Sequence, residues 1–400
     1  MSVVGVIGQG YVGLSLSVSA AQAGHRVIGF DTSDAVIKSL KSLKSPITNI
    51  SDKEIKHMIS NKSYHPTTDP KLLSECEIIV IAVPTPLDIS NNPDLTFVKS
   101  AVQIIIKNVD KKILIINEST SFPGTLRNVI AKEIEDVSKI KHEYASAPER
   151  IDPGNSTWTL TNTPRLISGM SKEAAAKAKK FYESFTNNVV EVETPEIAEM
   201  SKLLENTFRQ VNIALINQIS QICYELDIDV RDVISAAETK PFGFMKFLPG
   251  AGVGGHCIPV DPIYLSYIAD TTKSKATLIS LSDSINKQMP AYKISCIEKT
   301  LNSDLIDMEV IVVGIAYKPN ISDIRESPAI SVLNLLREKG VKTQWHDNVV
   351  SIWNNESSSN LDNQDLAIIV TIHDDLDVEK LRKVKHVFDC TGKVTWAKQI

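Results

Sequence analysis

The segment that decides the fold lies near the N-terminus and reads Val3-Val4-Gly5-Val6-Ile7-Gly8-Gln9-Gly10-Tyr11-Val12-Gly13. Its first five residues form a short apolar run, which is typical of a parallel strand buried on both faces. A G-x-G-x-x-G pattern follows directly. Gly8 permits a tight turn, Gly10 removes a side chain where a pyrophosphate approaches, and Gly13 lets helix and strand pack closely. The segment predicts a dinucleotide-binding unit with the phosphates at the N-terminus of a helix.

An acidic residue at the end of the second strand, Asp31, bears on which cofactor is bound. Its carboxylate is placed to hold a ribose 2′-hydroxyl, and no arginine follows closely to receive a 2′-phosphate. NAD is therefore favoured over NADP. A flavin, which uses the same fingerprint, and a Rossmann-like fold that has lost its ligand stay open as alternatives. Thr85 and Thr120 follow later strands, where both ligand contact and ordinary turn chemistry fit them.

Short β-branched runs recur along the chain at intervals that leave room for helices, which predicts doubly wound parallel sheets. The runs are Val3–Ile7, Val27–Phe30, Ile78–Val83, Ile113–Ile116, Val310–Val313 and Leu366–Val370. A long amphipathic helix from Thr194-Pro195 to about Leu226 interrupts this rhythm, with threonine at the cap and proline at the first helical position. A helix of this length usually spans between domains or forms the core of a dimer.

The C-terminal part of the chain contains a faint echo of the N-terminal part. Gly24 leads to a strand that ends at Asp31, and Gly340 leads to a strand that ends at Asp347. The second unit lacks the glycine fingerprint, so we expect no dinucleotide there. The fold expected is α/β, with two Rossmann-like doubly wound domains joined by a central helical region that contains one long helix. The domain boundaries expected are 1–190, 191–290 and 291–400.

Composition excludes several classes of protein. The chain has 400 residues, is 42% hydrophobic and 23% charged, and carries a net charge of −5, which argues against a general nucleic-acid binder. Its apolar runs are far shorter than a membrane span, and its opening residues enter a strand pattern rather than a signal peptide. Five scattered cysteines without a C-x-x-C pair fit a reduced cytoplasmic enzyme better than a disulfide scaffold or a zinc module.

One cysteine stands in an unusual context. Cys257 ends a run with four glycines in six residues, Gly250-Ala251-Gly252-Val253-Gly254-Gly255, and Asp261 follows it four residues later. Such a run brings backbone against something bulky or supplies amide donors. A thiol there is a candidate nucleophile, whereas Cys76, Cys223, Cys296 and Cys390 are interpreted as small buried apolar residues. His256 either activates the thiol or points away from it.

Other polar residues form possible binding groups. Lys202 and Asn206 share a face of the long helix, and Arg209 extends it, so they either hold a substrate hydroxyl and its oxyanion or form a solvated face. The segment from Ala147 to Gly154 adds an acid and a base on a loop, Glu149 and Arg150. Lys318, Arg325 and Glu326 follow a later strand and can pair with phosphates or with one another.

Together these motifs resemble the nucleotide-sugar 6-dehydrogenases, the family of UDP-glucose, GDP-mannose and UDP-N-acetylhexosamine dehydrogenases. The resemblance runs from the glycine fingerprint to Ala316-Tyr317-Lys318-Pro319 and Asp323-Ile324-Arg325-Glu326-Ser327. It implies oxidation of a sugar C6 alcohol to a carboxylate with two NAD⁺, while a cysteine carries the intermediate. It also implies a homodimer built on the central helix, a C-terminal domain that binds the UDP-sugar, and a product used for surface polysaccharide.

The resemblance assigns roles to particular residues. It makes Cys257 the nucleophile, Lys202 and Asn206 the residues that shuttle protons or steady an oxyanion, Asp261 an acid, and Thr120 with Glu149 the groups that place water. Tyr11, Val12, Thr85 and Arg325 fall where relatives touch NAD, and with Gly8, Gly10, Gly13 and Asp31 of the fingerprint and with Thr120 they make up the expected cofactor site. The positions at which relatives bind the UDP-sugar are Arg150, Ile151, Lys202, Asn206, Arg209, Gly254 and Lys318.

Two features bear on which sugar is bound. Val260 stands where UDP-glucose enzymes carry lysine, and Lys240-Pro241-Phe242-Gly243-Phe244 resembles the UDP-N-acetylglucosamine and UDP-N-acetylmannosamine branch. We expect UDP-N-acetylglucosamine, with UDP-N-acetylmannosamine or UDP-glucose as alternatives. More distant alternatives are a single-step hydroxyacid dehydrogenase, in which Cys257 is structural, and an NAD-binding sensor without turnover.

Overall fold

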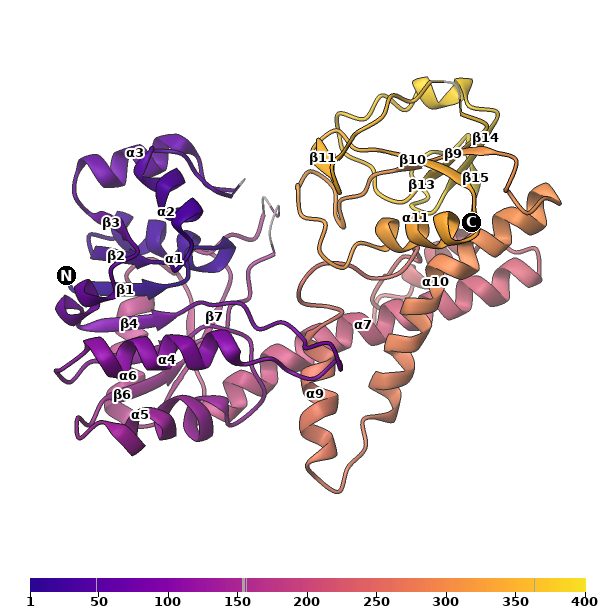
Figure 1. Cartoon of the computed structure of the whole chain (residues 1–400). Coiled ribbons are helices and arrows are strands. Elements are labelled where there is room, and N and C mark those ends of the chain that lie inside the picture. The colour runs from indigo at the N-terminus through magenta and orange to yellow at the C-terminus, as the bar shows by residue number, and fades with distance from the viewer. Residues whose placement is uncertain (48, 153–154, 156, 363) are drawn as a thin grey trace. The chain divides into compact units, whose positions relative to one another are not determined.

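The computed structural model describes residues 1–47, 49–152, 155, 157–362 and 364–400. The described chain forms two compact units, each shown in Figure 1. The first comprises Met1–Glu205 with Tyr267–Thr272, and the second comprises Asn206–Ser266 with Lys273–Ile400. The division into three domains at 1–190, 191–290 and 291–400 stays a prediction.

The first unit is built on an eight-stranded sheet. Its strand order is β3-β2-β1-β4-β5-β6-β7-β8, and β6 pairs with β7 in the antiparallel sense. The strands are β1 (Val3–Ile7), β2 (Arg26–Phe30), β3 (Tyr64–Thr67), β4 (Ile78–Ile81), β5 (Leu114–Asn117), β6 (Glu143–Ser146), β7 (Arg165–Gly169) and β8 (Val189–Glu191). The order of the first six strands is that of a dinucleotide-binding fold, whose ligand lies where the order reverses, between β1 and β4.

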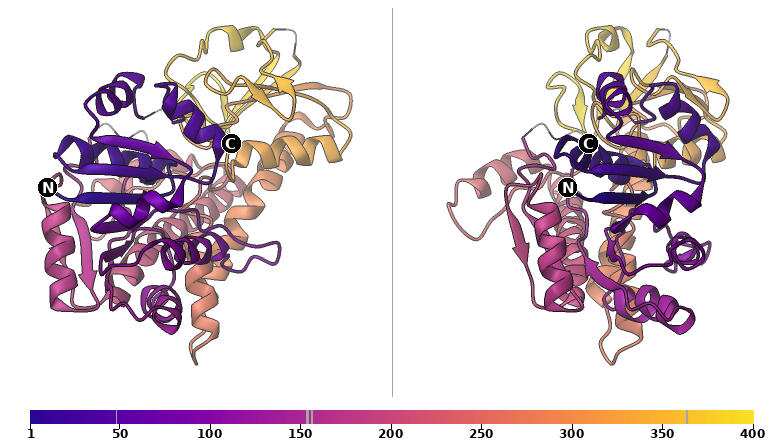
Figure 2. Two further views of the ribbon diagram at one scale, coloured as in Figure 1. Left: turned by 60° about the vertical axis from the view of Figure 1, so that its left-hand side comes forward. Right: turned by 90° about the vertical axis from the view of Figure 1, so that its left-hand side faces the viewer.

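Helices cover both faces of this sheet, as the right-hand view of Figure 2 shows. Successive residues of a strand point to opposite faces, so in β4 Ile78 and Val80 join one core while Ile79 and Ile81 join the other. The first core packs against α1 (Tyr11–Gln22), α2 (Asp34–Lys41), α3 (Asp52–Ser60) and α6 (Lys172–Tyr182). The second packs against η1 (Pro70–Glu75), α4 (Thr96–Asn108), the π-helical turn η2 (Leu126–Ala131) and α5 (Lys132–Val137).

The long helix expected near the centre of the chain is confirmed as α7 (Pro195–Glu225). The Oγ1 of Thr194 accepts a hydrogen bond from the N–H of Ile197 at 3.4 Å, which caps its first turn. Three more helices follow, α8 (Val230–Glu238), α9 (Asp261–Asp270) and α10 (Thr277–Leu301). No helix among the described residues is both long enough and apolar enough to cross a bilayer.

The second unit contains a five-stranded parallel sheet in the order β10-β9-β13-β14-β15. Its strands are β9 (Glu309–Val313), β10 (Lys342–His346), β13 (Leu366–Ile369), β14 (His386–Asp389) and β15 (Lys398–Gln399), and α11 (Pro328–Glu338) packs on the sheet. A hairpin of β11 (Ile352–Trp353) and β12 (Glu356–Ser357) follows β10, and the turn η3 (Lys380–Lys383) precedes β14. Two doubly wound α/β sheets are therefore confirmed.

The echo between the two units extends to atomic detail. The N–H of Gly8 donates to Phe30 O at 2.9 Å, and the N–H of Gly314 donates to His346 O at 2.8 Å. Both glycines have positive φ, +96° and +82°, which other residues rarely adopt. The residue after each acceptor is the strand-ending acid, Asp31 or Asp347. The glycine turn that bonds to the end of the neighbouring strand is thus built twice, although in the second unit α11 begins only at Pro328.

Candidate active site

The three glycines of the fingerprint differ in what a side chain would meet. A Cβ on Gly8 would lie 2.4 Å from Ala82 O, and one on Gly13 would lie 1.8 Å from Gly8 O, so packing within the protein excludes both. A Cβ on Gly10 would meet no described atom within 4 Å. The open space beside Gly10, at the N-terminus of α1, is the space a pyrophosphate needs. The residues present therefore fit a dinucleotide.

Loops at the carboxyl ends of the parallel strands surround this turn. Asp31 follows β2, and its carboxylate accepts hydrogen bonds from the N–H of Gln9 at 2.7 Å and of Ser33 at 2.8 Å. Thr85 is buried after β4, and Thr120 is half-buried after β5. The two loops are joined because Ser119 Oγ accepts from Val83 N at 2.9 Å and donates to Val83 O at 2.8 Å. Tyr11 and Val12 begin α1 and are half-buried.

Glu149 follows β6 and is buried among charges. Burial raises the pKa of its carboxyl, but Arg165, the N–H of Ile151 and Lys202 outweigh burial and hold that pKa below its usual value. Arg150, the next residue, forms an ion pair with Glu205 at 2.7 Å and donates to Pro164 O at 2.8 Å. The predicted acid–base pair is thus present, although its two members have different partners.

Lys202 and Asn206 are buried on α7, which contradicts the interpretation that they form a solvated face of the helix. These two side chains are 7% and 6% exposed. Arg209 is exposed, and Gln210, which is fully buried, continues their face of the helix instead at the same four-residue spacing. Gln210 donates to Asp283 Oδ1 at 3.4 Å. Gln210 is not among the residues predicted from the sequence, although the four-residue period of Lys202 and Asn206 points to it.

The last two glycines of the run before Cys257 pack against the side chain of Tyr317. A Cβ on Gly254 would lie 2.7 Å from Tyr317 Cβ, and one on Gly255 would lie 2.7 Å from Tyr317 Cε2. Gly255 also has a φ of +86° and donates its N–H to Arg325 O at 2.9 Å. The run therefore fits against the segment after β9, as expected for glycines that meet something bulky. Lys318, next to Tyr317, is half-buried.

Cys257 differs from the other four cysteines because it is exposed while they are buried. Burial raises the pKa of the Cys76 and Cys390 thiols to about 12 and also raises that of Cys296. A thiol of high pKa is a poor nucleophile. The structure thus agrees with the interpretation of the four as small buried residues and leaves Cys257 as the accessible thiol.

Two charged residues, Asp261 and Arg325, interact with Cys257 in different ways. Asp261 begins α9, donates its N–H to Cys257 O at 2.8 Å, and is 2% exposed. Its Oδ2 accepts a hydrogen bond from Asn206 Nδ2 at 2.5 Å. Arg325 forms an ion pair with Asp323 at 2.5 Å, and its charge interacts with Cys257. A cation near a thiol favours the thiolate.

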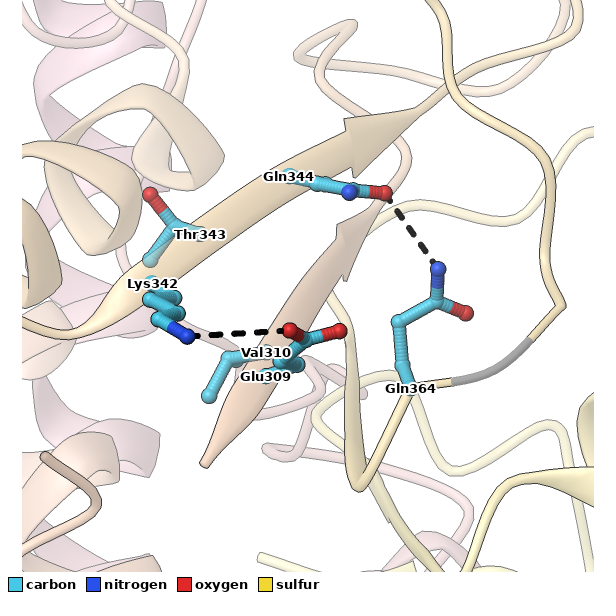
Figure 3. A pocket seen from close by; sticks show the side chains of 6 residues that line it. All are labelled: Glu309, Val310, Lys342, Thr343, Gln344 and Gln364. Carbon is cyan, nitrogen blue, oxygen red and sulfur yellow. Dashed lines mark hydrogen bonds and ion pairs between the residues drawn. The ribbon is translucent and has the colours of Figure 1, made fainter. Parts of the chain in front are cut away.

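Two surface depressions of the second unit have the wrong chemistry for an anionic nucleotide. The first, of about 230 Å³, lies at the amino ends of β9 and β10, away from the loops that follow the strands, and Lys342 there pairs with Glu309 at 3.9 Å (Figure 3). The second, of about 340 Å³, carries Asp362, Asp375 and Asp377. At the end of β10, Asp347 accepts from Ala316 N at 3.0 Å and from Val350 N at 2.8 Å. Backbone N–H groups of the protein thus bind the carboxylate of Asp347, which is the counterpart of Asp31 in the second unit.

The fold, the glycine turn and the accessible cysteine define an NAD-dependent oxidoreductase. Models of the UDP-glucose/GDP-mannose dehydrogenase family match the chain in three parts: the NAD binding domain at residues 2–186, the central domain at 196–288 and the UDP binding domain at 311–395. The chain belongs to this family, and it is an NAD-dependent UDP-sugar 6-dehydrogenase. The resemblance stated from the sequence is confirmed at this level.

Individual relatives carry a narrower description. The chain is 32% identical over 378 residues to the UDP-N-acetyl-D-mannosamine dehydrogenase of Pyrococcus horikoshii, covering 92% of this chain and 89% of that protein. It is 34% identical to the Campylobacter jejuni protein of the same description, covering 82% of each. The solved structure of the Pyrococcus horikoshii enzyme has a TM-score of 0.87 at 30% identity and covers 97% of this chain and 95% of its own. For Cap5O of Staphylococcus aureus, a UDP-N-acetyl-mannosamine dehydrogenase, the TM-score is 0.85 at 30% identity, over 100% and 96%.

Proposed function

We propose that the chain oxidises the C6 alcohol of a UDP-N-acetylhexosamine to the carboxylate in two steps, through a thiohemiacetal and a thioester on Cys257. The observation that carries this proposal is the exposure of Cys257 next to a glycine-rich turn, in which Gly255 donates its N–H to Arg325 O at 2.9 Å and Asp261 donates its N–H to Cys257 O at 2.8 Å. The sulfur holds the half-oxidised sugar, which would otherwise escape or hydrate, so that the second oxidation is effectively intramolecular.

The steps balance with two molecules of NAD⁺. The cofactor supplies one function, accepting a hydride from C6 in each oxidation. The alcohol loses a proton and a hydride to become the aldehyde, and the Cys257 thiolate adds to its carbon with uptake of a proton, giving a thiohemiacetal. Loss of a second proton and hydride gives the thioester. Water then adds to the carbonyl carbon, the C–S bond breaks, and the carboxylate, the free thiol and one proton result.

Residues on α7 and in the loops after β5 and β6 support these steps. Lys202 moves the C6 proton or stabilises the oxyanion, and Asn206 donates to the same oxygen or orients Asp261. Thr120 and Glu149 place the hydrolytic water. Glu149 is suited to accept a hydrogen bond from that water because its low pKa keeps it anionic. The assignment of NAD contacts to Tyr11, Val12, Thr85 and Arg325 belongs to the same proposal.

Substrate binding is assigned to the residues predicted for it from the sequence. Lys318 supplies a cation after β9, and the backbone at Gly254 approaches the sugar without a side chain in the way. Arg150, Ile151 and Arg209 complete the predicted set. For Arg150 this role requires the guanidinium to leave Glu205 or to serve both partners, because the ion pair already uses it.

The sugar proposed is N-acetylmannosamine, because the relatives described above bear that description. N-acetylglucosamine, expected from the sequence, is the second candidate, and the run Lys240-Pro241-Phe242-Gly243-Phe244 is the observation in its favour. NADH production from the two UDP-N-acetylhexosamines, UDP-glucose and UDP-galactose, measured side by side, decides between them. The product proposed is a uronic acid for a surface polysaccharide.

The stoichiometry of the reaction tests the chemistry. Two NADH per sugar are expected. One NADH per sugar would favour a single-step dehydrogenase with a structural Cys257, and no NADH with any UDP-sugar would favour a binding protein without turnover. Either of these results would contradict the proposed function.

A second copy of the chain is the partner proposed for α7. Large apolar side chains at Leu204, Phe208, Leu215 and Ile222 are 45–61% exposed and recur at spacings of four and seven residues along one side of the helix. Such a stripe is typical of helix pairing. Leu215→Lys should give a monomer by light scattering, and a variant that keeps the oligomeric state of the wild-type chain would contradict this interface.

A further inference from the structure

Four buried ionisable side chains of the first unit form one group: Glu118, Glu149, Arg165 and Tyr182. Arg165, at the start of β7, donates from Nη2 to Glu149 Oε2 at 2.7 Å, and its Nη1 is 3.5 Å from Glu118 Oε1. Tyr182 of α6 donates its hydroxyl to Glu118 Oε1 at 2.5 Å and lies with its ring 5.0 Å from the guanidinium. The side chains of Arg165 and Glu118 are 4% and 0% exposed. One guanidinium thus serves two buried carboxylates.

The two carboxylates are held very differently. Glu149 has both oxygens engaged, since Oε1 accepts from the N–H groups of Arg150 at 2.6 Å and Ile151 at 2.5 Å while Oε2 accepts from Arg165. Glu118 has one oxygen engaged, and its Oε2 has no hydrogen-bond partner among the described residues. A buried charge with an unpaired oxygen is costly, so the neutral form of Glu118 is favoured over that of Glu149.

The position of Glu118 links this group to the reaction. Glu118 follows β5 two residues before Thr120, and its N–H donates to Ile81 O at 2.9 Å. The backbone N–H of Glu149 lies 3.4 Å from Glu118 O. The carboxyl groups that share Arg165 therefore belong to the two adjoining loops that carry Thr120 and Glu149.

We propose that Glu118 and Arg165 are positioning residues for Glu149, and that the protonation state of Glu118 sets how much of the charge of Arg165 falls on Glu149. The proposal rests on the proposed function, in which Glu149 orients the water that hydrolyses the thioester. When Glu118 is neutral, Arg165 is directed at Glu149 alone and weakens it as a hydrogen-bond acceptor. When Glu118 is ionised, Arg165 is shared, and Glu149 accepts more strongly from the water.

The pH at which this change occurs follows from the surroundings of Glu118. Burial raises the pKa of Glu118 to about 7, and the charge of Glu149 acts in the same direction, while Arg165 and the hydroxyl of Tyr182 act against it. Among the described residues, these three groups, from β7, α6 and the loop after β6, are the charged and titratable groups that act on Glu118. Lys202 of α7 acts on Glu149 as well. Hydrolysis should therefore quicken as pH rises through neutrality.

The hydrolysis step itself can be measured. Enzyme turning over with saturating UDP-sugar and NAD⁺ is quenched in acid, and intact-mass analysis gives the fraction of Cys257 that carries the sugar acyl group. Turnover divided by that fraction is the rate constant of thioester hydrolysis, which we would follow between about pH 6 and pH 9. A merely structural role for Glu118 would change stability without changing the shape of this profile.

Two variants and a control test the proposal. Glu118→Gln mimics the neutral form, so hydrolysis should stay at its low-pH rate throughout, on the order of tenfold below the wild-type rate at the alkaline end, with more thioester bound. Tyr182→Phe removes a donor that favours the ionised form, so the titration should move to higher pH. Glu143→Gln, on the neighbouring strand and paired with Lys112 and Lys177, should leave the profile unchanged.

The outcomes separate this proposal from the proposed function. If wild type forms the thioester and both variants titrate where wild type does, or if wild type shows no titration near neutrality, the role of Glu118 is refuted while the function stands. If Glu118→Gln does not fold, the Tyr182→Phe shift decides. If wild type makes no acyl-cysteine, both proposals are overturned.

Discussion

The side-chain amide of Asn206 donates to the carboxylate of Asp261 at 2.5 Å, and Asp261 in turn donates its backbone N–H to Cys257 O at 2.8 Å. Asn206 is on α7 and Asp261 begins α9, so the hydrogen bond fastens the start of the helix that follows Cys257 to the long helix. Both side chains are buried, at 6% and 2% exposure, which strengthens a charge-assisted bond. The cysteine is thereby held by the backbone of a residue that α7 anchors.

Replacing the amide by an acid tests this link. Asn206→Asp places a second buried carboxylate beside that of Asp261, and such a pair is tolerated only when one of the two is protonated. We expect kcat to fall about tenfold to a hundredfold at neutral pH and to recover partly in acid. The measurement is kcat against pH, with Asn212→Asp, at a half-buried position on the same helix, as the control. An equal loss at every pH would contradict the explanation.

Removing the thiol tests covalent catalysis. Cys257→Ala should cut the net oxidation of the sugar by about 10³-fold or more, because no thioester can form, while the Kd for NAD stays unchanged. Steady-state NADH formation and calorimetry measure the two effects. Cys223→Ala, which removes a buried thiol, is the control and should lower stability rather than turnover. Activity of Cys257→Ala within tenfold of wild type would rule out the thioester.

The acid after β2 is expected to govern cofactor affinity. Asp31→Ala removes the acceptor for the ribose hydroxyl and also the bonds to the N–H groups of Gln9 and Ser33. We expect a loss of about 1.5–3 kcal/mol in NAD binding by calorimetry. Asp34→Ala, at an exposed acid in the first turn of α2, controls for the change in net charge. An unchanged Kd for Asp31→Ala would refute the assignment.

Glu199 gives a prediction about stability. Its carboxylate accepts from the N–H groups of Gly124 at 2.7 Å and Leu126 at 2.9 Å, which joins α7 to the segment before η2. Burial raises the pKa of Glu199 to about 7 despite these donors. The folded state thus binds a proton that the unfolded state releases near its ordinary pKa of about 4.5.

This difference in proton binding has a defined sign. The contribution of Glu199 to stability is complete below about pH 4.5 and is lost as pH rises through about 7. Glu199→Gln does not titrate, so its melting temperature should fall less than that of wild type between these two pH values. Thermal unfolding across this range measures the two slopes, and Glu196→Gln, at a partly exposed acid paired with Arg127, is the control. Parallel curves for Glu199→Gln and wild type would show that Glu199 does not titrate in the folded protein.

Local patterns were enough to predict much of the fold. The strands β1, β2, β4, β5, β9 and β13 were found because each is a continuous apolar run, and α7 because its apolar period persists after a clear start. The strands β6 and β7 were not found. Each has only two apolar residues in succession, Tyr144-Ala145 and Leu166-Ile167, and pairing with the neighbouring strands stabilises what this short local pattern does not predict.

The parts of the candidate site whose residues lie close together in the sequence were predictable. The glycine turn, Asp31 and Cys257 were found in this way. The cluster of Glu118, Arg165 and Tyr182 was not, because its members come from three elements that only the tertiary fold brings together. The choice between Arg209 and Gln210 depended on the helical phase of α7, which sequence spacing left open.

The carboxylate of Asp347 already accepts hydrogen bonds within the protein. Its oxygens accept hydrogen bonds from the N–H groups of Ala316, Val349 and Val350, and His373 Nε2 lies 3.0 Å away. Backbone groups of the protein therefore bind this carboxylate in the second unit, whereas in the first unit a side chain at Gly10 would meet no described atom within 4 Å. Grafting a glycine fingerprint after β9 would therefore not create a second dinucleotide pocket. A redesign would first have to remove the contact of Asp347 with His373 and its hydrogen bonds with the three backbone N–H groups. The turn that these interactions stabilise would then become less stable.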